Sequence, residues 1–118
     1  MVKMADRTRI DWNAALDAYS HAMGNRREEL DRYAAESGLE SQAHRIAARI
    51  VDVQERLYGV ATTIADADRR RFTAEDLEEI VAADAKRNGL ELNAIGRAAL
   101  LRWLIWMCWH EGLLDADA

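Results

Sequence analysis

The clearest pattern of apolar positions lies in the middle of the chain. Between Ala43 and Ile64 the apolar residues recur at steps that alternate between three and four. This spacing keeps them on one side of an α-helix and is typical of the seam along which two helices pack with a left-handed twist. We therefore predict a long helix from a Ser41 cap to about Ala65, with another element packed along its whole length. Its seam consists of Ala43, Ile46, Ile50, Val53, Leu57, Val60 and Ile64.

Two shorter helices are predicted before this one. The first begins at Asp11, whose carboxylate can cap free backbone N–H groups, and ends at Gly24, where a left-handed residue is tolerated. The second begins where Asn25 and Glu28 have the spacing of a capping box, and it ends at Gly38. Their inward faces are Trp12, Ala15, Leu16, Tyr19 and Met23 in the first helix, and Leu30, Tyr33 and Ala34 in the second.

A fourth helix has the best-specified start in the chain. Thr73 stands three residues before Asp76, which is the spacing of a capping box, and Phe72 and Leu77 occupy the positions of a hydrophobic staple. Acidic residues cluster in the first turns and basic residues in the last, as the helix dipole favours. We expect this helix to end at Gly89.

The fifth helix, predicted from about Asn93 to about Glu111 with Gly112 as its stop, is apolar around nearly its whole circumference. A helix of this kind is either central in its own chain or buried in an oligomer. Tryptophan is enriched in binding hot spots and in the interfaces of homodimers. We therefore expect self-association through the three tryptophans that recur here at every third position, Trp103, Trp106 and Trp109.

Together these elements predict a single all-α domain that spans residues 1–118. Its fold should be a compact bundle of about five helices, with the long third helix and the apolar fifth helix at the centre and the other three covering them. The glycine turns of the second and fourth helices are similar, since Gly38-Leu39-Glu40 matches Gly89-Leu90-Glu91. Shared turn chemistry explains this likeness more simply than a duplicated hairpin, and both explanations stay open.

Composition supports a helical protein and limits the cellular compartments and the kinds of site that we expect. The 118 residues include no proline and one cysteine, so an internal disulfide and a four-cysteine zinc site are excluded. No apolar run reaches the roughly 18 residues of a membrane span, and we expect a cytoplasmic protein. The net charge of −5 argues against non-specific binding to nucleic acid, and the whole deficit lies after Arg71.

Arginines form a candidate surface for a charged partner. Arg45, Arg49 and Arg56 share one side of the predicted long helix, where they could bind a phosphate backbone or an acidic protein. The ordinary solvated face of an amphipathic helix explains the same pattern. The partner-binding residues that we predict are Arg45, Arg49, Arg56, Arg69, Arg70 and Arg71.

The sequence gives little support for catalysis or metal binding. The chain contains no metalloprotease motif, glycine-rich phosphate loop or nucleophile elbow, and its three histidines are scattered. We therefore expect no catalytic residue, no metal and no cofactor, and we expect Cys108 to be a buried, inert thiol.

A charged side chain on the apolar face of a helix needs a partner of opposite charge. We therefore predict that Asp84 pairs with Arg102.

These patterns favour a small non-enzymatic protein of bacterial or phage type that acts by binding other proteins. We expect an adaptor, an inhibitor or a regulatory subunit that also forms a homodimer. The alternative is a DNA-binding regulator. The spacing of Ala85, Gly89, Ile95 and Ala98 resembles a helix-turn-helix, and Leu77 to Leu104 is similar in rhythm to a ribbon-helix-helix repressor.

Overall fold

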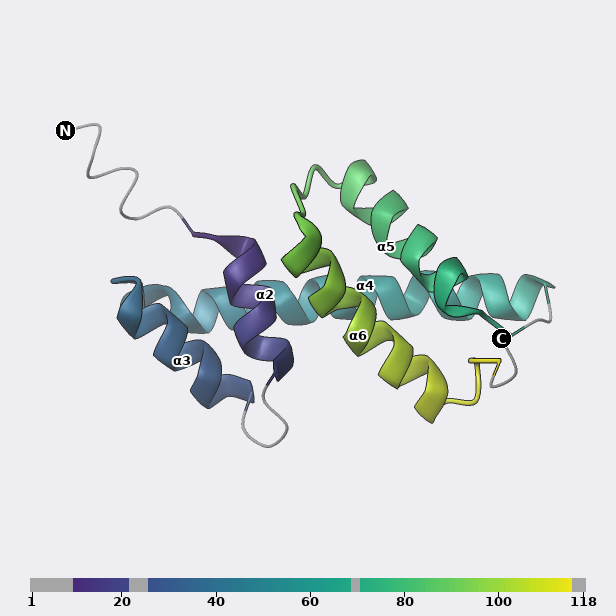
Figure 1. Ribbon diagram of the computed structural model, residues 1–118, viewed down its shortest axis with the longest axis horizontal. Helices are drawn as coiled ribbons and strands as arrows, with labels where there is room; N and C mark the ends of the chain where they lie inside the picture. The colour runs from purple at the N-terminus through teal and green to yellow at the C-terminus, as the bar shows by residue number, and fades with distance from the viewer. Residues whose placement is uncertain (1–9, 22–25, 69–70, 116–118) are drawn as a thin grey trace.

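The computed structural model describes residues 10–21, 26–68 and 71–115, and in this part of the chain it is all-α. A long helix and an apolar C-terminal helix are both present, as predicted. Figure 1 shows the arrangement of the five helices. They are α2 (Trp12–His21), α3 (Arg26–Glu36), α4 (Ala43–Asp68), α5 (Ala74–Arg87) and α6 (Ala94–His110), with a 3₁₀ turn, η1 (Glu40–Gln42), before α4.

Helix α4 runs along the length of the bundle, and the other helices cover it in two groups (Figure 1). Helix α3 packs against one end of α4, while α5 and α6 pack against the rest. Helix α2 joins the groups because it contacts both α3 and α6. The resulting molecule is longer than it is wide, with dimensions of 53 × 30 × 20 Å.

The apolar seam of α4 forms the middle of the core. The first five predicted positions, from Ala43 to Leu57, are buried, whereas Val60 and Ile64 are only partly buried. Beyond Leu57 the buried row continues through Ala61 and Ala65 instead. An average step of 3.5 residues drifts around a helix that has 3.6 residues per turn, so the buried row moves to neighbouring positions by the third heptad.

Three helices end in the same way, at a glycine with positive φ. Gly38, Gly89 and Gly112 have φ values of 71°, 66° and 73°. In each case the N–H of the next leucine donates to the carbonyl five residues before it, at 2.7 Å from Leu39, 2.9 Å from Leu90 and 2.7 Å from Leu113. This is the Schellman motif, which satisfies the last carbonyl groups of a helix. The predicted ends at Gly38, Gly89 and Gly112 are confirmed, and the predicted end at Gly24 lies outside the described residues.

The helix starts agree with the sequence in three places and differ in one. Asp11 accepts a hydrogen bond from the Ala14 N–H, Asn93 accepts one from Gly96, and Thr73 forms the predicted capping box with Asp76. The prediction that Ser41 caps the long helix is wrong. Ser41 lies inside η1, where backbone bonds one turn long satisfy the N–H groups that a cap would otherwise bind.

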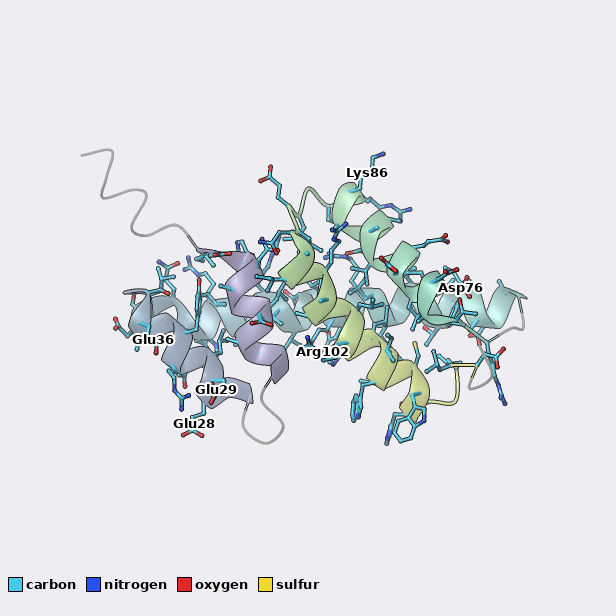
Figure 2. The ribbon with its side chains drawn as sticks, in the orientation of Figure 1. Glu28, Glu29, Glu36, Asp76, Lys86 and Arg102 are labelled. Carbon is cyan, nitrogen blue, oxygen red and sulfur yellow. The ribbon has the colours of Figure 1, made fainter. Side chains whose placement is uncertain are left out.

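Charges at the two ends of α5 follow the helix dipole. Asp76 lies in the first turn of α5 and Lys86 in the last, at opposite ends of the helix (Figure 2).

Before α5, the backbone of Phe72 pairs with the segment that follows α6. Its N–H donates to Leu113 at 2.7 Å, and its carbonyl accepts from Asp115 at 2.8 Å. These bonds and the fully buried Phe72 side chain attach the C-terminal segment to the bundle.

Candidate interaction surfaces

A cleft of about 1040 Å³ runs along α4 between the start of α2 and the turn that joins α5 to α6. Both flanking segments lie on the same side of α4 in Figure 1. Three of the predicted partner-binding arginines line it, so we name it the arginine cleft. Its lining residues are Ile10, Asp11, Trp12, Asn13, Leu16, Arg45, Arg49, Ile50, Val53, Arg56, Asn88, Gly89, Leu90 and Glu91.

Polar and apolar groups occupy different parts of the arginine cleft. Leu16, Ile50 and Val53 are buried members of the core and form an apolar floor. The carboxylates of Asp11 and Glu91 belong to exposed residues on its two walls. The cleft can therefore contact both an apolar group and charged groups of one ligand.

Asn13 joins the two walls of the cleft. Its side-chain amide donates to the Glu91 carbonyl at 3.2 Å, and its Oδ1 accepts from the Asn93 N–H at 2.9 Å. Gly96 of α6 lies against the same side chain, and a Cβ atom at this position would be 2.9 Å from the Asn13 Cγ. Sequence analysis missed this contact, although a glycine inside an otherwise apolar helix is a signal for close packing.

Arg56 is engaged within the molecule. Its Nε and Nη2 each donate to one carboxylate oxygen of Asp84, both at 2.8 Å, and the Asp84 side chain is 7% exposed. The Asn88 amide donates to Asp84 Oδ1 as well, at 3.2 Å. These hydrogen bonds to Asp84 raise the pKa of the Arg56 guanidinium above its ordinary value. The pair ties α5 to α4 at one end of the cleft.

The predicted pairing of Asp84 with Arg102 is therefore wrong. Periodicity placed Asp84 on the buried side of α5 but did not say which neighbouring helix that side meets. It meets α4, where Arg56 provides two parallel donors. Arg102 is exposed and extends from α6 on the side of α2 (Figure 2).

Arg45 and Arg49 differ from Arg56 in their surroundings. Both are exposed, and neither forms a hydrogen bond or an ion pair with any described part of the chain. They stand four residues apart on one helix, where like charges repel each other. Their guanidinium groups thus line the cleft without a direct ion pair to any carboxylate among the described residues.

The remaining predicted arginines do not extend the cleft. Arg71 is exposed and follows the end of α4. At 1.5 Å per residue, the stretch of α4 from Arg56 to Asp68 already separates it from the cleft by about 18 Å. Arg69 and Arg70 lie outside the described residues.

The second candidate surface is the exposed side of α6. Trp106 and Trp109 are 46% and 64% exposed, and Ile95 is 54% exposed. At 100° per residue these three positions fall on one side of the helix, which we name the tryptophan face. The opposite side is core and contains Leu100, Leu104 and Cys108.

The three predicted tryptophans have different environments. Trp103 is partly buried and packs against the core, so only Trp106 and Trp109 belong to the tryptophan face. The Trp106 ring stacks on His110, with 5.4 Å between ring centroids and 11° between planes. A side chain that is already held in place loses less conformational entropy when a partner binds.

Cys108 is buried, as predicted, and His110 lies on a different side of α6. Cys108 is fully buried, and burial raises the pKa of its thiol. His110 lies on the exposed side of α6, where it contacts Trp106. No group of three potential metal-ligating side chains occurs in the part of the chain that the structure describes.

Comparison with known proteins adds no further identification. No family model, curated protein or solved structure matches this chain. Within residues 10–21, 26–68 and 71–115, no helix has the length and apolar character that crossing a membrane requires.

Proposed function

We propose that this is a non-enzymatic protein that acts by binding other proteins and that pairs with a second copy through the tryptophan face. An adaptor, an inhibitor or a regulatory subunit would act in this way. The observation that carries the proposal is the exposure of Trp106 and Trp109 on a helix whose opposite side is core. Exposed tryptophans are costly in water and are typical anchors of interfaces.

The exposed apolar area of the tryptophan face limits the affinity of such a dimer. A fully buried tryptophan contributes up to about 250 Å², so the exposed parts of Trp106 and Trp109 supply roughly 250–300 Å² per protomer. A stable interface buries about 800 Å² per partner. Ile95 and the partly exposed Ile105 add to the patch but do not close this gap. We therefore expect a weak dimer, with a dissociation constant in the micromolar range.

Light scattering at a series of concentrations tests this proposal. The intact chain should shift from monomer to dimer as its concentration rises to about 200 µM, which spans the micromolar range. Trp106→Glu should stay monomeric because a second copy would bury an unpaired carboxylate. Circular dichroism should show that the variant keeps its helical content, since Trp106 is not part of the core.

Ala82→Glu on α5 provides the matched control, because Ala82 is an exposed helical position away from the tryptophan face. It adds the same charge and should dimerise as the intact chain does. A monomeric intact chain at every concentration would contradict the proposal. So would a Trp106→Glu variant that dimerises with unchanged affinity.

Sequence-specific DNA binding stays a prediction. In a helix-turn-helix the first turn of the second helix enters the major groove. At the corresponding place here, Asn93 and Gly96 contact Asn13 of α2. In a ribbon-helix-helix the strand before the helix pairs with a second protomer, whereas Phe72 pairs with Leu113 and Asp115 of its own chain. Neither contact favours a DNA-binding mode over the protein-binding proposal.

A further inference from the structure

We propose that the arginine cleft is a docking site for an acidic segment of another protein, one that carries carboxylate and apolar side chains together. This goes beyond pairing through the tryptophan face, because it assigns a second surface to a different partner. The two surfaces share no residue, so each can be disabled without the other.

The positive charge of the cleft points to a carboxylate ligand. Arg45 and Arg49 are one helical turn apart and unpaired among the described residues, so each raises the electrostatic energy of the other. A carboxylate between two guanidinium groups relieves this repulsion and accepts parallel hydrogen bonds. Arg56 is less suited to this role because two of its five N–H groups donate to Asp84, whose carboxylate already neutralises its charge.

The apolar floor points to a ligand with apolar side chains. Leu16, Ile50 and Val53 lie below the arginines, and the partly buried Trp12 stands on the wall. From Arg45 to Arg56 the cleft follows α4 for about 16 Å at 1.5 Å per residue. An extended peptide rises about 3.3 Å per residue, so about five residues span this length.

The walls favour a protein segment over a nucleic acid. Asp11 and Glu91 place negative charge on both sides of the cleft, where it would repel a continuous phosphate backbone. A peptide has fewer charges and donates backbone N–H groups, which these carboxylates can accept.

The Arg56–Asp84 pair shapes the cleft without binding the ligand. Asp84 accepts from both Arg56 and Asn88, and Asn88 begins the turn that carries Glu91. Asn13 holds the same turn from the other wall. The site therefore exists before a partner arrives, which lowers the entropy that binding must overcome.

Nuclear magnetic resonance titration of the full chain tests the proposal. The probe is a capped peptide of about eight residues in which glutamate and phenylalanine alternate, long enough to span the cleft. We expect saturable shifts of the backbone amides of Arg45, Arg49 and Gly89. The double variant Arg45→Gln and Arg49→Gln should weaken binding about tenfold or more, because it removes both charge-assisted contacts.

Two controls keep this test separate from dimerisation. Trp106→Glu should bind the peptide as the intact chain does, even where it abolishes self-association. Arg97→Gln removes an exposed arginine of α6 outside the cleft and should leave affinity unchanged within about twofold, the effect expected of a distant surface charge.

Three results would overturn the assignment. The first is the absence of saturation up to about 5 mM peptide, beyond which affinity is negligible. The second is equal affinity for a peptide with glutamine in place of glutamate, or for the double arginine variant. The third is tighter binding of a single-stranded oligonucleotide of equal length, which would assign the cleft to nucleic acid.

Discussion

The contact between α4 and α5 and the exposed side of α6 differ in how they place side chains that are energetically unfavourable in their surroundings. At the first, Asp84 is buried, but its carboxylate accepts two hydrogen bonds from Arg56 and one from Asn88. At the second, two tryptophans remain about half exposed to water although burial would stabilise them. The polar groups of the first region find their partners within a single chain, whereas the apolar surface of the second is not covered by the chain itself.

This difference separates residues that stabilise the fold from residues that are available for binding. In the described part of the chain no buried polar side-chain atom lacks a hydrogen-bond partner, so the interior needs nothing from outside. The exposed apolar surface of the tryptophan face and the repulsion between Arg45 and Arg49 are both unfavourable. Binding of another molecule would relieve them. Substitutions should therefore affect stability in the first region and association in the second.

The largest expected loss of stability follows Asp84→Ala. Removing one partner of a buried ion pair costs about 3–5 kcal/mol, and the partial exposure of Arg56 to water reduces this to about 2–3 kcal/mol. Chemical denaturation should show the loss directly. Glu78→Ala, at an exposed position of α5, serves as the control and should change stability by less than about 0.5 kcal/mol. Similar values for both variants would remove the distinction between the two regions.

A smaller loss is expected from Gly96→Ala. The new Cβ would collide with the Asn13 side chain, which cannot move without breaking its bonds to Glu91 and Asn93. We expect destabilisation of about 1–2 kcal/mol, despite the better helix propensity of alanine. Thermal unfolding of the variant measures it.

Gly59→Ala is the matched control for this substitution. Gly59 lies within α4, is exposed and has open space around a Cβ atom. Alanine should therefore stabilise the protein here, by about 0.5–1 kcal/mol. Stabilisation at both glycines would mean that Asn13 does not restrict α6.

The smallest effect on stability is expected from Trp109→Glu. Its side chain is 64% exposed, so the free energy of unfolding of the monomer should change by less than about 0.5 kcal/mol. Sedimentation velocity should nevertheless show weaker self-association than in the intact chain. A large loss of stability would place Trp109 among the core residues and end the contrast between the two regions.

Much of the fold could be predicted because its signals are local. The capping box of Thr73 and Asp76 and the turns at Gly38 and Gly89 involve residues at most five positions apart. Such interactions depend on the chain around them and not on the fold. Ser41 shows the limit of this approach, because a 3₁₀ turn supplied the bonds that a cap was predicted to make.

The candidate surfaces were predictable only in part. Arg45, Arg49 and Arg56 were grouped correctly by helical spacing, and all three line one cleft. Spacing could not show that Arg56 is paired internally, since its partner lies 28 residues away. Nor could it show that Asn13 meets residues of the α6 start about 80 positions later.

The sequence by itself determined the number of helices, most of their ends and the apolar side of α4, because these features follow from contacts within one or two turns. The tertiary structure decided which charges meet and which tryptophans stay exposed. Helices with similar apolar stripes can pack in several rotations, and only the packed bundle selects one. That selection pairs Asp84 with Arg56, forms the cleft beside Arg45 and Arg49, and directs Trp106 and Trp109 away from the core.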